Sequence, residues 1–303
     1  MYPPIIIFAY NRPKHFLELI ESINQNNKDI KNKFFLICDG PKNKFDKNQI
    51  KKIKEIISLK KFKFKEKIFR KKNLGLAKNI INGVTKVLKK NKSCIVLEDD
   101  LILKKNSIHF MNNFLDSFNE VKNIGSISAH SYLDDYKKYN KYNYYFTKRH
   151  SSWCWGTWSR VWNKINWRNL NYKRHFNNFK EMNRFSEAGN DLNLLLWGQY
   201  KNYINSWAVR FNYFCSKKNL ISFQPRFSMI INNGRDSSGT HESFSIKRQN
   251  IKNFTPNMKI KKKDLDKKVL SNIEVDEFIK KNHRKSIKLS IRYLLKNKKK
   301  IPA

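Results

Sequence analysis

Acidic residues are scarce in this chain of 303 residues. Only 24 Asp and Glu stand against 64 Lys and Arg, which gives a formal net charge of +40. Such an imbalance leaves two interpretations open. The first is a polyanionic partner, either nucleic acid or an anionic membrane face. The second is a general drift of composition toward lysine on solvated helix faces, which would imply no particular partner.

Cysteines and long apolar runs are also few. The four cysteines at positions 38, 94, 154 and 215 contain no CxxC pair and no zinc-type spacing, so we expect reduced, structural thiols. No run approaches the roughly 18 to 20 apolar residues that span a bilayer. The N-terminal MYPPIIIFAY lacks the basic region of a signal peptide. These absences together favour a cytoplasmic protein.

Apolar residues are nevertheless plentiful. They make up 40% of the chain, with 22 Phe, 13 Tyr and 7 Trp, which is enough for one large α/β domain or two small ones. Strand-like and helix-like segments alternate over the first 130 residues, and this pattern predicts a mostly parallel sheet flanked by helices. The expected strands are 3–10, 33–40, 66–70, 93–100 and 124–130, and the expected helices are 13–26, 50–57, 73–90 and 108–118.

Three acids stand in a row at the end of the fourth expected strand, as Glu98-Asp99-Asp100. Adjacent carboxylates repel each other, and carboxylates beside a core lose solvation, so a positive charge must offset them. Mn²⁺ or Mg²⁺ prefers carboxylate oxygens and accepts phosphates as further ligands, which predicts a metal–diphosphate site. The alternative is an N-cap cluster for the following segment.

Other polar residues fall at the ends of neighbouring strands. Arg12 and Asp39 follow the first two strands, and ligands of such sheets bind outside the carboxyl ends of the strands. The stretch NLGLAKNIINGV contains Asn73, Gly75 and Asn79, which would bring backbone close to a ligand at a helix N-terminus. A simple turn explains this stretch equally well.

Four stretches together resemble the GT-A glycosyltransferases in order and rough spacing: PIIIFAYNRP, LICDG, NLGLAKNIINGV and IVLEDDLIL. The third is similar to bacterial family 2 members, and VLEDDLILKKNSIHFMNNFL resembles the eukaryotic N-acetylglucosaminyltransferase I group. The resemblance covers residues 3–130 well and 150–243 more loosely. It departs from the usual family 2 pattern because Glu98 stands where the first Asp of Asp-x-Asp is expected, which leaves open which acid holds the metal.

The resemblance implies roles for the donor side. Tyr10, Asn11 and Arg12 would line the nucleotide pocket, and Asp39 would accept a hydrogen bond from the base. Asp100 would contact Mn²⁺ or Mg²⁺ directly. Glu98 or Asp99 would touch sugar or ribose hydroxyls. A rival acidic pair, at 134–135, lies among Lys and Tyr and is expected on a surface loop.

The resemblance also implies two residues beyond the sheet. Asp191, in AGNDLNLLLW, matches the carboxylate that removes the proton of the acceptor hydroxyl in inverting members. His241, in GRDSSGTHES, resembles the loop that closes over the donor and would touch metal or phosphate. The alternatives are a helix N-cap for Asp191 and an exposed loop histidine for His241.

Five of the seven tryptophans lie within residues 149–167. Trp155, Gly156 and Trp158 would form an acceptor platform, because flat indoles stack on sugar rings. The alternative is a second small core. We also expect a helix over 187–200 and a Gly/Ser/Asn-rich loop over 225–243.

Residues 283–303 contain eight basic residues and no acid. With apolar residues at helical spacing, they predict a basic amphipathic helix that binds an anionic membrane surface, or a solvated helix packed on the domain. The expected organisation is a nucleotide-sugar-binding half (1–130), an acceptor-binding and catalytic half (131–246) and a basic helical extension (247–303).

The sequence therefore predicts a cytoplasmic, metal-dependent glycosyltransferase. It would move a hexosyl or N-acetylhexosaminyl group from a nucleotide-sugar donor to a glycan or lipid-linked glycan, in surface polysaccharide assembly, with inversion implied by the resemblance. The rivals are a basic nucleic-acid-binding protein and a nucleotidyltransferase. The aromatics cluster with Gly instead of alternating with Lys, and no Gly-rich basic loop follows the first strand, so we expect no nucleic acid as partner.

Overall fold

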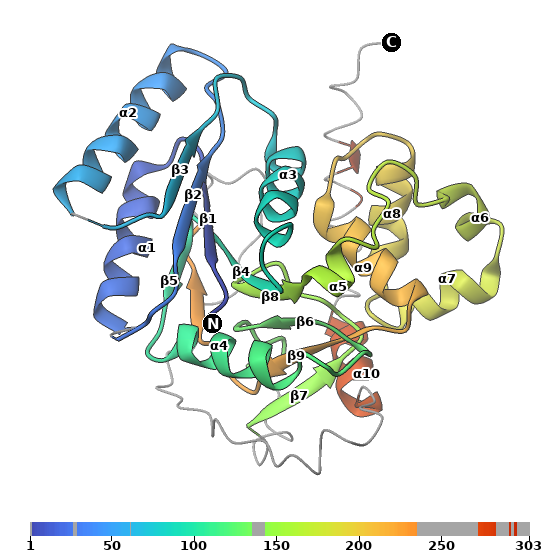
Figure 1. Cartoon of the computed structure of the whole chain (residues 1–303). Coiled ribbons are helices and arrows are strands. Elements are labelled where there is room, and N and C mark those ends of the chain that lie inside the picture. Colours follow the sequence, from blue (N-terminus) through green and yellow to red (C-terminus); the bar gives the residue numbers. More distant parts are fainter. Residues whose placement is uncertain are drawn as a thin grey trace.

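The computed structural model describes residues 2–26, 29–60, 62–134, 143–234 and 272–282, together with Ile291, Leu294 and Leu295. Its centre is an eight-stranded sheet with the order β3-β2-β1-β4-β8-β6-β9-β7, and a second, two-stranded sheet pairs β10 with β5 (Figure 1). The strands are β1 (Ile5–Ala9), β2 (Phe34–Cys38), β3 (Glu66–Phe69), β4 (Ser93–Glu98), β5 (Leu101–Leu103), β6 (Ile124–Ser128), β7 (Tyr144–Thr147), β8 (Trp155–Trp158), β9 (Ile221–Pro225) and β10 (Ile230–Asn232).

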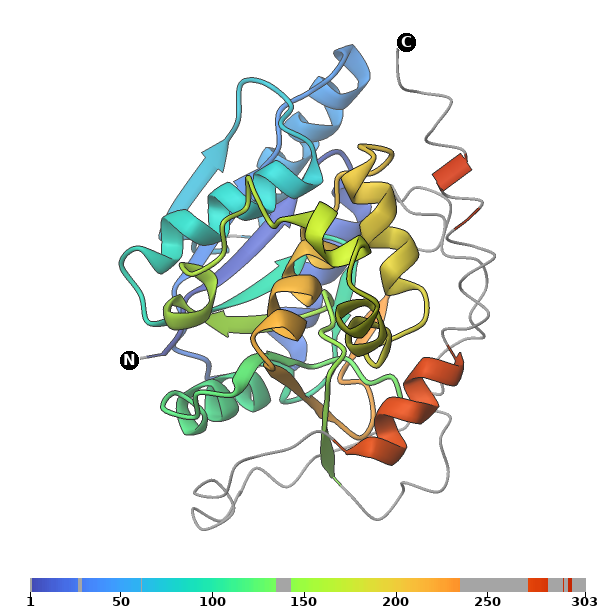
Figure 2. The ribbon, with the colours of Figure 1, turned by 90° about the vertical axis from the view of Figure 1, so that its right-hand side faces the viewer.

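Helices cover both faces of the large sheet. The helices α3, α5 and α9 contact one another on one face, and α1 and α2 lie together on the other (Figures 1 and 2). The helices are α1 (Pro13–Asn26), α2 (Lys44–Leu59), α3 (Leu76–Leu88), α4 (Ser107–Ser117), α5 (Ser159–Trp162), α6 (Tyr172–Phe176), α7 (Phe179–Ser186), α8 (Leu192–Tyr200), α9 (Trp207–Lys217) and α10 (Ile273–Asn282). No helix of the described part is long and apolar enough to cross a membrane.

The first half of the sheet matches the prediction. The strands β1, β2, β3 and β4 pair in parallel, and every residue of β1 is buried, as expected for a strand covered on both faces. Helix α3 is amphipathic, because Ile80, Val84, Val87 and Leu88 recur at helical spacing and are buried along one side. The α/β fold class is thereby confirmed.

The second half departs from the prediction. β8 lies between β4 and β6 and is antiparallel to both, so one sheet spans the boundary expected at residue 130. The stretch 225–243, expected to be a loop, contains β10, whose Ile230 pairs with Leu103 of β5. The helix expected over 187–200, entered at Asn190-Asp191, is α8, which begins at Leu192 with Asp191 at its N-cap and follows a φ of 146° at Gly189.

The second half also contains the four-residue helix α5 and the described C-terminal helix α10. Val275 and Ile279 of α10 pack on Leu133 and Tyr145. The carboxylate Oδ1 of Asp276 accepts hydrogen bonds from Thr147 Oγ1 at 2.6 Å and Lys148 N at 3.0 Å. α10 therefore lies along β7, the last strand of the sheet.

All four cysteines are buried free thiols in this structure. Burial raises the pKa of Cys38 and of Cys154 to about 12. Protonated, buried thiols are poor nucleophiles and poor metal ligands. The structural interpretation of the cysteines is therefore confirmed.

Candidate functional site

The acid triplet lies where the sequence placed it, at the carboxyl end of β4, next to the carboxyl ends of β1 and β2. Arg12, at the start of the turn after β1, reaches across to it. Its guanidinium NH2 donates to Asp99 Oδ1, and its NH1 donates to Asp100 Oδ2 at 3.1 Å. The backbone N–H of Tyr10 donates to the other oxygen of Asp99 at 3.1 Å.

Arg12 therefore supplies, within the chain, the positive charge that the acids require. Burial raises the pKa of Glu98 to about 8, and the charges of Asp100 and Asp99 add to this rise while Arg12 opposes it. Burial likewise raises the pKa of Asp99 to about 6, against the attraction of Arg12. The triplet is thus a strained cluster of carboxylates that any added cation would relieve.

Asp100 is more accessible than Asp99, with 16% of its side chain exposed against 3% for Asp99. The turn after β10 lies against it. Asn233 N donates to Asp100 O at 2.8 Å, and a Cβ on Gly234 would stand 2.4 Å from Asp100 Oδ2. Any larger residue at position 234 would collide with the Asp100 carboxylate. The sequence analysis missed Gly234, although NNG is a typical turn signal.

The donors at this edge fit one kind of metal site. Among the described residues, no three His, Cys, Asp or Glu side chains are arranged to hold a metal ion. Mg²⁺ and Mn²⁺, however, are often held by one or two carboxylates together with substrate phosphates and water. Asp100 can supply one such carboxylate, and a diphosphate would supply the rest. His241, the other expected ligand, lies outside the described residues.

Asp46 organises the nucleotide side of the edge and was missed in the sequence. Its carboxylate accepts from Tyr10 OH at 2.5 Å, from Asn11 Nδ2 at 2.8 Å and from Lys42 N at 2.9 Å. Burial alone would raise the pKa of Asp46, but these hydrogen bonds lower it below its ordinary value. The signal was local: Asp46 stands three residues after Asn43, whose side chain caps α2.

Asp39 binds the loop before α3. Its two carboxylate oxygens accept from Leu74 N and Gly75 N, both at 2.9 Å. Asn73 Nδ2 donates to Gly40 O at 2.8 Å. Gly75 has a φ of 76° and no heavy atom near its missing Cβ, so it turns the chain into the helix beside open space.

Asn79 serves the fold. The side-chain oxygen of Asn79 accepts from Arg70 Nε at 2.5 Å, and Asn79 is 3% exposed. Asp39 therefore binds the loop that contains Asn73 and Gly75, whereas the side chain of Asn79 contacts Arg70 at the end of β3. A role for Asn79 in nucleotide binding stays a prediction, and no contact of this side chain supports it.

Asp191 lies in a buried ion pair. Arg149 NH1 donates to Oδ1 at 2.8 Å and Arg149 NH2 to Oδ2 at 2.9 Å, and only 3% of Asp191 is exposed. Arg149 also lies over the ring of Tyr132, with 5.6 Å from its guanidinium carbon to the ring centroid. A side chain on Gly189 would strike Arg149 NH1. Asp191 stands at the N-cap position of α8, as the alternative expected, but its side chain accepts no capping hydrogen bond there and instead binds Arg149.

The acceptor platform predicted for Trp155, Gly156 and Trp158 is wrong. All three residues belong to β8 and are buried in the middle of the sheet. The Trp155 ring stacks on Trp207 of α9, with centroids 4.6 Å apart. On the other face a Cβ at Gly156 would lie 2.9 Å from Cys94 O. The indoles belong to the main core between the sheet and its helices, so they do not form the second small core of the alternative either.

The rival acidic pair gives no second site within the described residues. Asp134 Oδ1 accepts from Ser228 N at 2.7 Å, and burial raises its pKa. It therefore ties the turn after β6 to the turn after β9 and is not the surface-loop acid that was expected. Residue 135 is outside the described part.

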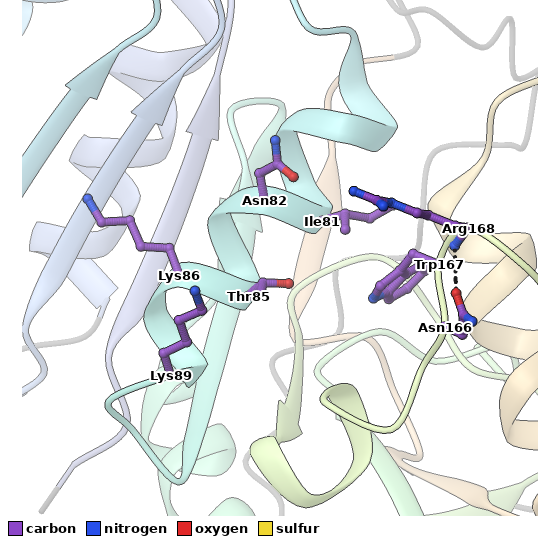
Figure 3. A pocket seen from close by; sticks show the side chains of 8 residues that line it. All are labelled: Ile81, Asn82, Thr85, Lys86, Lys89, Asn166, Trp167 and Arg168. Atoms are coloured by element: carbon purple, nitrogen blue, oxygen red, sulfur yellow. Dashed lines mark hydrogen bonds between the residues drawn. The ribbon is translucent and has the colours of Figure 1, made fainter.

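A pocket of about 510 Å³ lies elsewhere, between α3 and the loop after α5 (Figure 3). Lys86, Lys89 and Arg168 surround it, and Trp167 forms part of its wall. None of the predicted site residues lines it. Its lysines stand near the C-terminal end of α3, whereas the Asp39 loop contacts the N-terminal end, so this pocket is separate from the carboxylate edge.

Polar residues therefore gather at the carboxyl ends of β1, β2 and β4, which is where α/β sheets bind their ligands. The chain belongs to glycosyl transferase family 2, because the model of that family matches residues 5–184. It is therefore a glycosyltransferase with the GT-A fold.

Solved structures give more distant similarities. An active-site mutant of LgtC shares 9% identity, covers 72% of each chain and has a TM-score of 0.40. The galactosyltransferase LgtC in complex with donor and acceptor sugar analogues shares 10% over 72% of each chain, with a TM-score of 0.39. The apo structure of the bifunctional glycosyltransferase WbbM shares 10% over 47% of this chain and 25% of that chain, with a TM-score of 0.27. No curated protein matches the sequence. The resemblance to the N-acetylglucosaminyltransferase I group stays a resemblance.

Proposed function

We propose that the chain transfers a hexosyl or N-acetylhexosaminyl group from a nucleotide-sugar donor to a hydroxyl of a glycan or lipid-linked glycan, with inversion. The observation that supports it most is the partly exposed Asp100 carboxylate, which Arg12 contacts at 3.1 Å at the edge where Asp39 and Asp46 also lie. Family 2 membership supplies the reaction type.

The donor would bind across the ends of β1, β2 and β4. Tyr10 and Asn11 are fixed by Asp46, so their turn is rigid before the nucleotide arrives. Asp39 holds the Leu74–Gly75 turn, and the open space beside Gly75 admits a ligand close to the backbone. Preorganised polar groups of this kind reduce the ordering that binding requires.

Asp100 would hold Mn²⁺ or Mg²⁺ together with the diphosphate of the donor, and His241 would be a further ligand. When bound, the metal neutralises charge on the diphosphate leaving group. The chain's own contribution is Arg12. Its guanidinium already stabilises carboxylates at this edge and can donate to an anionic oxygen of the donor.

The acceptor side would use Asp191. Its carboxylate would take the proton of the acceptor hydroxyl while that oxygen bonds to the anomeric carbon and the bond to the nucleoside diphosphate breaks. Arg149 binds both oxygens of Asp191, so one contact must open as the acceptor arrives. Tyr132, over which Arg149 lies, stands beside this pair.

We further propose a cytoplasmic enzyme of surface polysaccharide assembly that works at the membrane. A basic chain without disulfides suits that location. It also suits acceptors that are displayed on an anionic membrane face.

The test is slow hydrolysis of a panel of nucleotide sugars with and without Mn²⁺, on wild type and Asp100→Asn. We expect one donor to be hydrolysed in a metal-dependent manner and the rate to fall at least about 100-fold in Asp100→Asn, as when a group that stabilises developing charge is lost. The matched control is Asp116→Asn, on the exposed side of α4. Metal-dependent hydrolysis that survives in Asp100→Asn would show that Asp100 does not hold the metal.

Asp191 is tested separately with the donor so found and a glycan acceptor. Asp191→Asn should lower transfer by about 10²- to 10⁴-fold, the usual contribution of a general base, while donor hydrolysis stays unchanged. Transfer within a few-fold of wild type would refute the base assignment. A thermal melt of the same variant shows whether Arg149 still folds into place.

A further inference from the structure

Exposed apolar side chains gather on one part of the molecule. Ten large apolar side chains of the described residues are exposed, and half of them belong to α7, α8 and the described C-terminal residues. These five are Phe179, Trp197, Tyr200, Ile291 and Leu295. We call them the apolar patch. The helices α6, α7 and α8 form a lobe beside the sheet (Figure 1), and Phe179, Trp197 and Tyr200 belong to it.

Two contacts join other segments of the chain to α8. Leu294 is 4% exposed and packs onto Gly198, where a Cβ would stand 2.1 Å from Leu294 Cδ2. Leu294 therefore lies against the turn of α8 that carries Trp197 and Tyr200, and Ile291 and Leu295 are its neighbours in the sequence. The Tyr200 ring in turn lies 5.9 Å from Phe176 of α6, which connects α8 to the start of α7.

The lobe is also positively charged. Each carboxylate of residues 172–201 has a cationic partner: Glu181 lies near Arg174, Glu187 pairs with Lys148, and Asp191 pairs with Arg149. Of the remaining Lys and Arg residues, the lysines are exposed and Arg184 is half-buried. Lys173, Lys180 and Lys201 form no ion pair within the described ranges, and Lys201 lies over the Tyr200 ring at 5.1 Å.

From this combination we infer that the α6–α8 lobe, with the C-terminal residues around Leu294, is a docking surface for an anionic lipid bilayer. Trp and Tyr favour the membrane–water interface, aliphatic side chains enter the acyl boundary, and lysines are attracted by anionic headgroups. A nucleic acid or another soluble polyanion would use the lysines but would gain nothing from exposed Ile291 and Leu295. The eight basic residues of 283–303 add charge of the same sign.

The position of α8 links this surface to the proposed acceptor site, a step that rests on the proposed function. α8 begins directly after Asp191, and Trp197 stands six residues further along. At 1.5 Å of rise per residue, this corresponds to roughly 9 Å. A sugar attached to a lipid at the membrane surface would therefore meet the candidate base without leaving the headgroup region.

The experiment is co-sedimentation of the full chain with phosphatidylcholine vesicles that contain or lack phosphatidylglycerol. We expect binding only with the anionic lipid. The charge variant Lys173→Glu/Lys180→Glu/Lys201→Glu should weaken it by more than about 100-fold, at about fivefold for each lysine. The apolar variant Phe179→Ser/Leu295→Ser should weaken it by about tenfold, because these side chains are 77% and 58% exposed and contribute by burial in lipid.

Matched controls lie on α2, on the other side of the sheet (Figure 1). Lys47→Glu/Lys51→Glu/Lys52→Glu changes the charge equally, and Phe45→Ser/Leu59→Ser removes side chains that are 64% and 79% exposed. Equal loss in the lobe and α2 variants would overturn the proposal, because net charge alone would then explain binding. Binding to dextran sulfate that is as tight as binding to the anionic vesicles would also overturn it, because a soluble polyanion would then explain the affinity. Donor hydrolysis, measured on every variant, reports the proposed function independently.

Discussion

Arg12 carries the central charge of the site, and it changes how the acid triplet is understood. The sequence showed that three adjacent carboxylates beside a core need a positive charge, and it favoured a metal. The structure shows that Arg12, 87 residues away from Asp99 in the chain, meets this need in the absence of any ligand. A metal bound at Asp100 would therefore compete with an existing ion pair, because both neutralise the same carboxylate.

The first prediction concerns this competition. Arg12→Gln should lower the free energy of unfolding by about 3 kcal/mol, because Asp99 would be left buried without its partner. Mn²⁺ should then raise the stability of Arg12→Gln more than that of wild type, since the metal no longer displaces an arginine. Urea unfolding with and without Mn²⁺ measures both effects.

Two variants control this measurement. Arg70→Gln removes an arginine whose side chain contacts Asn79, so it should lose stability without gaining a response to Mn²⁺. Adding Asp100→Asn to Arg12→Gln should abolish the response. An equal response to Mn²⁺ in wild type and Arg12→Gln would mean that metal and Arg12 do not share a carboxylate.

Some residues of the site could be predicted from the sequence, and others could not. Arg12, Asp39 and the triplet were identified because each follows an apolar strand, and parallel strands bring their ends together. Arg149 was missed because its partner Asp191 is distant in sequence, Asp46 because its local signal at Asn43 was overlooked, and Gly234 because its turn was taken for part of a long loop. Local patterns show which residues end a strand, but the pairing of charges depends on the folded arrangement.

At the scale of secondary-structure elements, β8 is a strand that the pattern of apolar residues did not predict. The strands of the large sheet and the helices of the first 130 residues were predicted because apolar runs alternate there with helical periodicity, whereas β5, which pairs with β10, was not predicted. WCWGTW gave no such alternation, and its tryptophans resembled a sugar platform. In the structure β8 is buried on both faces: Trp155 contacts α9 on one and Gly156 approaches Leu115 of α4 on the other.

The second prediction follows from this packing. Gly156→Ala should cost about 2 kcal/mol of stability, because the new methyl group would stand 2.9 Å from both Cys94 O and Leu115 Cδ1. The Michaelis constant for acceptor should not change, since Gly156 is buried. Thermal unfolding and acceptor kinetics measure the two quantities.

Gly75→Ala is the matched comparison, because nothing lies within 4 Å of its missing Cβ. It should cost about 1 kcal/mol through its positive φ alone. A stable Gly156→Ala protein with weakened acceptor binding would restore the platform that the structure rejects.

At the scale of the whole molecule, the charge of +40 is spread over both halves of the chain. The acids are few, and most of them form ion pairs or hydrogen bonds within the fold. Asp99 and Asp191 pair with the half-buried arginines Arg12 and Arg149, and Asp39 and Asp46 accept backbone and side-chain hydrogen bonds. The basic surface attracts polyanions in general. The carboxylate edge, by contrast, repels phosphate unless a cation intervenes. A nucleotide sugar and a nucleic acid should therefore respond differently to salt.

The last prediction uses this difference. Binding of the donor nucleotide in the presence of Mn²⁺ should change by less than about threefold between 50 and 200 mM salt, because it depends on a few short contacts at a partly buried edge. Binding of a generic DNA duplex should fall by about 10³- to 10⁵-fold over the same interval, as counterion release requires. Fluorescence anisotropy with a labelled nucleotide and a labelled duplex measures both. Duplex binding that persists at 200 mM salt, together with the absence of metal-dependent nucleotide binding, would favour a nucleic-acid-binding role for the basic surface.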